Sequence, residues 1–340
     1  MRVVGLLLGS IAAAGIACAA TVAPFRIVEV GSVAAVPVSR IAPQTIAFSD
    51  HKADDLADRT SGLMRFEDWA QTRMLQKQYL GLFPTYEEPV LRSPNAKPRK
   101  KHLHVYVAEG RFTIDRAAAS IDLARYVTLP FLEQIDPAIK HKLIAPDDVI
   151  PNHEPQSANH NPNRQWCQGG GTIICIGSTY KLEGKLPLGI ALVNKIKEHG
   201  KKYSDTIEFQ SELRVVPAAE INDADYRKLT GVDAPIAGAL EQNIVHVNEV
   251  MQFGKLLAVF QANPANASQT VVTAFVVLGV DSELFEKKKE YANVPVLRNL
   301  IPAQVIAGNS TFNTGDSISS GLPNYARNHL KAIAALLDHE

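Results

Sequence analysis

Cysteine is scarce in this chain of 340 residues, which has three, and neither sign of charge is in excess. Lys and Arg together number 35, and so do Asp and Glu. This balance gives no electrostatic reason to bind nucleic acid or an anionic membrane surface. After the N-terminal stretch, no apolar run reaches the roughly 18 residues that a membrane-spanning helix needs. The composition, 46% hydrophobic and 21% charged, is that of a globular protein and excludes a mainly disordered one.

The N-terminal stretch, residues 1–20, has the pattern of an export signal. Arg2 supplies a positive charge, an apolar stretch follows, and Ala17-Cys18-Ala19 offers the small side chains that a signal peptidase reads. We therefore expect cleavage near Ala19 or Ala20 and a soluble protein in the periplasm or outside the cell. An uncleaved membrane anchor and lipid attachment at Cys18 are the alternatives, and any membrane contact is expected through this segment alone.

Two cysteines remain after such a cleavage, Cys167 and Cys175, and they have one possible pairing. An oxidising compartment favours a disulfide between them. The triple glycine 169–171 lies between the two cysteines and bends easily, so that the two sulfurs can meet across a hairpin. It lacks the lysine of a phosphate-binding loop, and no cofactor is predicted.

Along the chain we expect an extended arm over residues 21–50, with one strand at 25–30, followed by a single globular domain over 51–340 that has a possible subdivision near 145–166. The first half of that domain is predicted to hold a helix at 66–82, a hairpin at 103–114 that turns at Gly110, a helix at 117–125 capped by Asp115, and a helix at 130–142.

The second half of the domain has the pattern of an antiparallel sheet. Residues 207–215 alternate between apolar and polar side chains, which predicts a strand with one buried face and one wet face. Further strands at 244–253, 255–262 and 269–280 are joined by Gly254 and by residues 263–266, and links this short permit only hairpins.

A closing helix is predicted at 323–337, with Leu330, Ile333, Ala334 and Leu337 on one face. The predicted fold class is therefore α+β, with a mostly antiparallel sheet (a meander at about 244–280) packed with helices and a closing C-terminal helix. In architecture alone, this combination of a meander and a closing helix resembles the helix-grip lipid-binding folds.

One catalytic pattern stands out at Ser178-Thr179-Tyr180-Lys181. It resembles the Ser-x-x-Lys of penicillin-binding proteins and serine β-lactamases, in which Lys181 would lie one helical turn from Ser178 and help activate it. Gly184 and Pro187, however, end any helix here within two turns, and the later motifs of that family do not match. The competing interpretation places Ser178 and Lys181 in solvent on the second arm of the disulfide hairpin.

A metal site is a weaker alternative. His153, His160 and Cys167 are spaced seven residues apart in a polar loop, but none of the usual zinc-binding spacings is present, so no metal is predicted.

Two segments are candidates for ligand binding. Glu249 falls in phase with apolar residues of its predicted strand, where an acid must be paired or must face a cavity; a strand bulge that turns it to water is the alternative. The segment 308–321 is small, polar and bounded by glycines, and it offers Asn309, Ser310 and Asn313; a simple linker is the alternative.

Two functional hypotheses follow. The first is an exported protein without catalytic activity that binds a small apolar or amphipathic molecule, or an unknown partner, against the sheet. The second is a serine hydrolase of the cell envelope that uses Ser178 and Lys181. A cavity between the sheet and the last helix would favour the first hypothesis.

Overall fold

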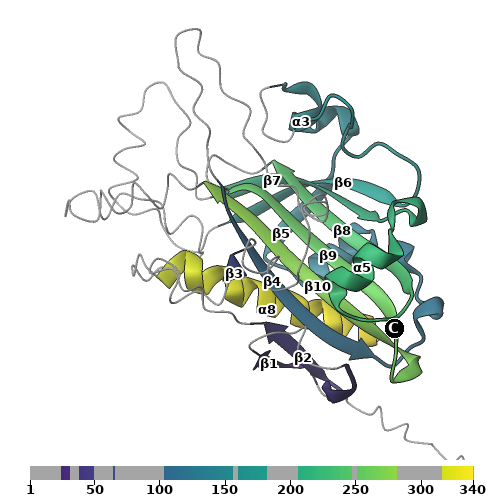
Figure 1. Cartoon of the computed structure of the whole chain (residues 1–340). Coiled ribbons are helices and arrows are strands. Elements are labelled where there is room, and N and C mark those ends of the chain that lie inside the picture. The colour runs from purple at the N-terminus through teal and green to yellow at the C-terminus, as the bar shows by residue number, and fades with distance from the viewer. Residues whose placement is uncertain are drawn as a thin grey trace, which may run out of the picture.

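The computed structural model describes residues 24–30, 38–49, 64–65, 103–155, 160–181, 206–246, 251–281 and 316–339. One sheet dominates them (Figure 1). Its strand order is β1-β2-β4-β10-β9-β8-β7-β6-β5, and the short β3 also pairs with β4. The bounds are β1 Arg26–Val30, β2 Thr45–Ser49, β3 Met64–Arg65, β4 Leu103–Ile114, β5 Ile139–Leu143, β6 Ile173–Lys181, β7 Thr206–Val215, β8 Ile236–His246, β9 Met251–Asn263 and β10 Asn266–Asp281.

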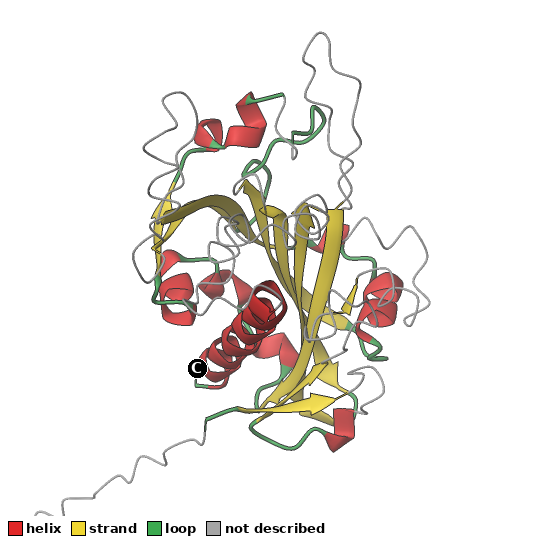
Figure 2. Ribbon diagram, turned by 90° about the vertical axis from the view of Figure 1, so that its left-hand side faces the viewer, coloured by secondary structure: helices red, strands yellow, loops and turns green. Residues whose placement is uncertain are grey.

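The described helices are few, and one of them is long. The α-helices are α2 Leu129–Ile135, α3 Ile150–His153, α5 Asp223–Thr230 and α8 Asp316–Asp338. The sheet bends around α8, which lies against its concave side (Figure 2). Within the described part of the chain, no helix combines the length and the apolar character needed to cross a bilayer. The fold class predicted from the sequence, α+β with a mostly antiparallel sheet and a closing helix, is confirmed; β1 and β2 form a parallel pair at one edge.

The closing helix is longer than predicted, since it begins at Asp316. The predicted polar segment 308–321 therefore runs into the helix over its last residues, while Asn309, Ser310 and Asn313 lie outside the described residues. The predicted apolar face is largely buried: Leu330, Ala334 and Leu337 are almost fully covered, and they pack into the main core together with side chains of the sheet.

The meander is confirmed, but its first hairpin was misplaced. Strands β8, β9 and β10 are antiparallel neighbours, and residues 263–266 make the second hairpin as predicted. Gly254, however, lies inside β9 opposite Ile244, where a Cβ atom would come within 3.0 Å of the Ile244 side chain. The glycine therefore marks a close side-chain approach within the sheet. Glu249 lies between β8 and β9, outside the described residues.

The predicted hairpin at 103–114 is wrong, because these residues form the single strand β4. Gly110, the predicted turn, pairs with Ala274 of β10 and Phe48 of β2. A Cβ atom added to Gly110 would overlap the Leu330 side chain of α8. Glycine is suited to this position because α8 packs closely against it, and not because the chain turns here.

The two predicted helices that follow β4 are also shorter than expected. Residues 117–125 contain two 3₁₀ turns, Ala118–Ser120 and Leu123–Tyr126, and Asp122 rather than Asp115 caps the second by accepting from the backbone N–H of Ala124. The helix predicted at 130–142 ends as α2 at Ile135 and gives way to β5. Pro137 explains the break, because a residue that precedes proline avoids the helical conformation.

The segment predicted as an extended arm belongs in part to the sheet. Its predicted strand is confirmed as β1, which pairs with β2, and β2 in turn pairs with β4. The predicted helix at 66–82 and the N-terminal stretch 1–20 lie outside the described residues.

The disulfide between Cys167 and Cys175 is present, with the two Cα atoms 5.5 Å apart. Gly169 and Gly171 adopt positive φ angles in the loop that it closes. Trp166, Cys175, Val149 and Val245 form a small core beneath this loop. The predicted disulfide is thus confirmed, but the glycine loop leads from a turn into β6 and does not join two paired strands.

Candidate functional site

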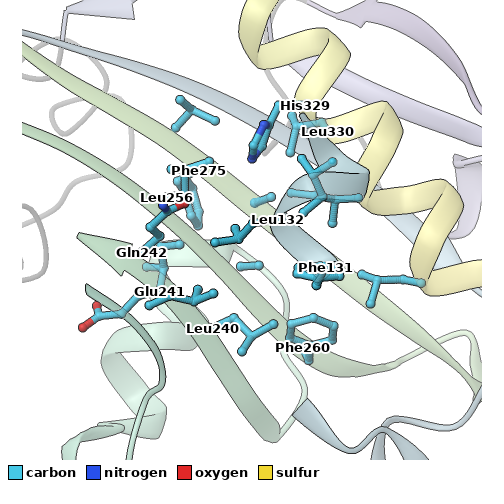
Figure 3. Close-up of a pocket in the computed structure, with 18 residues that line it drawn as sticks. Phe131, Leu132, Leu240, Glu241, Gln242, Leu256, Phe260, Phe275, His329 and Leu330 are labelled. Atoms are coloured by element: carbon cyan, nitrogen blue, oxygen red, sulfur yellow. The ribbon is translucent and has the colours of Figure 1, made fainter. Parts of the chain in front are cut away.

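A pocket lies between the concave face of the sheet and the helices α2 and α8 (Figure 3). Its volume is about 550 Å³, which includes the gaps between side chains and the space at its open side. The residues around it come from six elements: Phe131, Leu132 and Ile135 of α2; Leu213 of β7; Leu240, Glu241 and Gln242 of β8; Leu256, Leu257, Ala258 and Phe260 of β9; Ala274, Phe275 and Val276 of β10; and His329, Leu330, Ile333 and Leu337 of α8.

Small residues on the floor of the sheet make room for the helix and the pocket. Gly110, Ala274 and Ala258 are paired side by side on β4, β10 and β9. Successive side chains of a strand point to opposite faces, so these three positions share the concave face with Phe260 and Val276. Had these positions carried large side chains, α8 could not approach the sheet as closely as it does.

Two polar side chains with no formal charge at neutral pH belong to the lining. Gln242 lies on β8 opposite Leu213 of β7 and Leu256 of β9, and its side-chain N–H donates to the Ser211 hydroxyl at 3.0 Å. His329 lies on α8 and is buried. Burial lowers the pKa of His329 to about 4, and the nearby His141 acts in the same direction. His329 is therefore neutral at neutral pH.

Glu241 is the acidic member of the lining, but its carboxylate is bound elsewhere. It accepts from Lys255 Nζ at 2.8 Å, from Arg214 at 2.6 Å and from Asn243 Nδ2 at 3.0 Å. Burial alone would raise its pKa; Lys255 and Arg214 outweigh burial and lower the pKa to about 2. Figure 3 shows its oxygens directed away from the other lining side chains. Glu241 thus belongs to a charge network on the opposite face of the sheet.

A polar row crosses the concave face from the pocket to the β5 edge of the sheet. It consists of Gln242 on β8, Ser211 on β7, Ser178 on β6 and His141 on β5. Gln242 bonds to Ser211, and the Ser178 hydroxyl and His141 Nδ1 are 2.8 Å apart. Burial lowers the pKa of His141, which Glu133 and Asp136 partly offset. The members come from four successive strands, but the two bonded pairs are offset in register, since Ser211 pairs with Ile176 and Ser178 with Phe209.

The catalytic candidates Ser178 and Lys181 lie on β6, not on a helix. A strand places residues three apart about 10 Å from each other along the chain, so this segment does not bring Lys181 one helical turn from Ser178. Ser178 is also buried, whereas the alternative interpretation placed it in solvent. The neighbour that the structure gives its hydroxyl is His141, from a strand that the sequence analysis assigned to a helix.

The two histidines of the weak metal alternative do not line the pocket. His153 is the last residue of α3, and the ring of His160 bonds through Nδ1 to the Pro151 carbonyl at 2.8 Å. Among the described residues, no cluster of His, Cys, Asp and Glu could hold a metal ion. Glu249, Asn309, Ser310 and Asn313 lie outside the described residues, and so their placement is untested.

The polar face of β7 is wet over only part of its length: Glu208 is exposed as predicted, but the face becomes buried toward Glu212. Glu212 is almost fully buried and accepts from Arg164 at 2.8 Å and from the Cys167 backbone N–H at 2.6 Å. Arg214, on the same face, joins Glu212 to Glu241 and Glu220. The sequence could not distinguish this buried network from a solvated face, because the alternating pattern is the same in both cases.

Gln242 and His329, the two neutral polar residues of the pocket, are not among the candidates predicted from the sequence. His329 had a detectable signal: it is four residues before Ile333, so a helix with Ile333 on its buried face places His329 there too. Gln242 had no such signal. The predicted strand began at residue 244, so residue 242 was not assigned to either face of the sheet.

No protein-family model matches the chain, and no curated protein matches it in sequence. Several solved structures align with about two thirds of it, among them the following three. Ara h 8.0201 has 10% sequence identity and a TM-score of 0.31, with 69% of this chain and 99% of that chain covered. A START superfamily protein from Mycobacterium smegmatis has 8% identity and a TM-score of 0.29 (68% and 98% covered). The Zhui aromatase/cyclase from Streptomyces sp. R1128 has 10% identity and a TM-score of 0.32 (68% and 93% covered). At values this low, no conclusion about a ligand or an activity follows from the likeness.

Proposed function

We propose that this protein binds a small apolar or amphipathic molecule between its sheet and α8, without catalysing a reaction on it, after export from the cytoplasm. The observation that carries the proposal is the pocket itself, a concave site lined almost wholly by aliphatic and aromatic side chains with two neutral polar groups. Sites of this composition are typical of small-molecule binding. The export signal pattern at residues 1–20 and the Cys167–Cys175 disulfide support the cellular location.

The ligand would gain most of its affinity from burial of its apolar surface, at roughly 25 cal/mol per Å². The pocket is open on one side and bounded by strands and helices on the others, so a ligand could enter from the open side. Specific contacts with Gln242 and His329 would then orient the ligand rather than supply most of the binding free energy.

The binding test uses the neutral fluorescent dye N-phenyl-1-naphthylamine, whose emission rises in an apolar site. We expect saturable binding to the wild-type protein. Ala258→Leu and Ala274→Leu should each weaken dye binding at least tenfold, because each adds three carbon atoms to the floor of the pocket. Ala265→Leu is the matched control, since Ala265 is exposed at the turn of the same β9–β10 hairpin.

Far-UV circular dichroism and a thermal melt establish that each variant is folded. If one filled variant does not fold, the other still tests the site. Unsaturable dye binding, or equal binding by the control and both filled variants, would refute this pocket as the site.

The absence of catalysis and the location are tested separately. A fluorophosphonate probe that labels Ser178 would overturn the non-catalytic part of the proposal. For the location, the full chain is expressed in a Gram-negative host, and the mass of the product is measured after periplasmic release. We expect loss of about 19 or 20 residues. An intact product in the cytosol, with the thiols of Cys167 and Cys175 open to alkylation, would contradict export.

A further inference from the structure

The pocket is polar at one end and apolar at the other. Residue 242 is four positions along β8 from Gly238, the partner of Phe260, which separates Gln242 from Phe260 by about 13 Å along the strands. Figure 3 shows Gln242 and His329 away from Leu240, Phe260 and Phe131, which lie toward the opposite end. A bound molecule would therefore place its polar group beside Gln242 and its apolar part beside Phe260.

The polar end offers hydrogen bonds without a positive charge. Gln242 carries an amide with donor and acceptor atoms, and Ser211, to which it bonds, carries a hydroxyl. Among the described residues that line the pocket, none is a Lys or an Arg. The cations near this part of the sheet, Lys255 and Arg214, are bound to the carboxylate of Glu241 on the other face.

Two acidic groups lie near the outer end of the polar row. Glu133 and Asp136, at the end of α2 and just after it, interact electrostatically with His141, the outer member of the polar row. An anionic ligand group would have to give up its water without a cationic side chain in the described lining, which makes its burial costly. A hydroxyl or carbonyl group can instead exchange its hydrogen bonds with water for bonds to neutral side chains, which costs far less.

We propose that the ligand is an uncharged amphipathic molecule whose single polar group is a hydroxyl or a carbonyl, and that Gln242 and His329 select it over the corresponding carboxylate. This proposal rests on the proposed function, since it specifies the chemical class that the same pocket accepts. It names Gln242 and His329 as residues that determine specificity rather than as residues that supply most of the affinity.

The test compares two probes with the same chain length, dodecan-1-ol and dodecanoate, in displacement of N-phenyl-1-naphthylamine at pH 8. Dodecanoate is used below its micellar concentration and dodecan-1-ol below its solubility limit in water. We expect dodecan-1-ol to displace the dye with at least tenfold higher affinity. Equal or stronger displacement by dodecanoate would overturn this inference and leave the proposed function intact. Failure of the dye itself to bind would instead remove the proposed function.

Two substitutions at Gln242 assign the selectivity to this residue. Gln242→Leu should retain dye binding and lower the affinity for dodecan-1-ol about fivefold to tenfold. Gln242→Arg places a cation at the polar end and should shift the preference toward dodecanoate by at least tenfold. Gln134→Leu, at an exposed position on α2, is the control and should change neither affinity.

A thermal melt of each variant separates loss of fold from loss of binding. If Gln242→Arg does not fold, Gln242→Leu still decides the matter. An unchanged affinity of Gln242→Leu for dodecan-1-ol would contradict the role of Gln242.

Discussion

Gly110 sets how closely the two layers of the molecule approach each other. It lies on the concave face of β4, beneath α8, and the Leu330 side chain occupies the space where a Cβ atom would be. Leu330 is almost fully buried, and so are its helix neighbours Ala326 and Ala334. One missing methyl group in the sheet thus permits one large side chain in the helix.

The first prediction tests this pairing. Gly110→Ala should lower the free energy of unfolding by about 1–3 kcal/mol, because the added methyl forces Leu330 from its place in a packed core. Leu330→Ala should cost about 2–5 kcal/mol through the cavity that it leaves. The double variant should lose less than the sum of the two, since the shortened side chain on α8 leaves room for the new methyl. Urea denaturation measures all three, and additive losses would show that the two residues do not share this space.

At the scale of single elements, the loop that carries the disulfide covers a buried acid. Glu212 on β7 accepts hydrogen bonds from Arg164, three residues before the first cysteine, and from the backbone N–H of Cys167. Cys175 pairs with Glu212 across β6 and β7, so the disulfide fastens the loop directly over the carboxylate. The loop therefore keeps the charge of Glu212 compensated in an otherwise buried place.

The second prediction concerns the disulfide bond between Cys167 and Cys175. The variant Cys167→Ser/Cys175→Ser should lose about 2–3 kcal/mol of stability, as expected for a bridge that closes a loop of this length. Amide hydrogen exchange should accelerate over residues 160–172 more than over β9 and β10. Dithiothreitol should lower the melting temperature of the wild-type protein and leave that of the double variant unchanged. If the reductant has no effect on the wild type, the bridge contributes nothing to stability.

The same scale shows which elements could be predicted from the sequence. Three elements could be predicted because their apolar residues are regularly spaced. They are the strand at 207–215, the strand at 269–280 and the closing helix. Gly110 and Gly254 were both assigned to turns, although each accommodates a side chain from elsewhere in the fold. A glycine without positive φ has no local signal that distinguishes a turn from close packing. The sequence therefore could not show that β4 and β9 continue through these two glycines.

At the scale of the whole molecule, the two faces of the sheet are covered differently, one by apolar side chains and the other by buried ion pairs. The concave side, under α8, holds the apolar core and the pocket. The other side holds the ion pairs of Glu212, Arg214, Glu241 and Lys255. The fold class was predictable because periodicity is local. The pocket was not, because α2, the middle strands and α8 are up to two hundred residues apart and are brought together only by the strand order.

The last prediction concerns His329, which is buried on the side of α8 that faces the pocket. His329 has a pKa of about 4 in the folded protein because burial disfavours its charged form, whereas an unfolded chain has a value near 6.5. Between about pH 6.5 and 4 the unfolded chain therefore binds a proton that the folded protein does not bind. The free energy of unfolding should fall as the pH is lowered through this window, by about 3 kcal/mol in total.

His141, whose pKa burial also lowers, adds to the loss in the same direction. Glu241, with a pKa of about 2, contributes mainly below this window. His329→Gln should flatten the dependence of stability on pH between 6.5 and 4, measured by urea denaturation at half-unit steps. His339→Gln, at an exposed position just after the same helix, should retain the wild-type slope.

Because a charged His329 would lie between α8 and the pocket, dye binding should weaken together with stability over the same pH window in the wild type. The weakening should be smaller in His329→Gln. Parallel pH profiles for all three proteins would show that the burial of His329 does not determine the acid sensitivity.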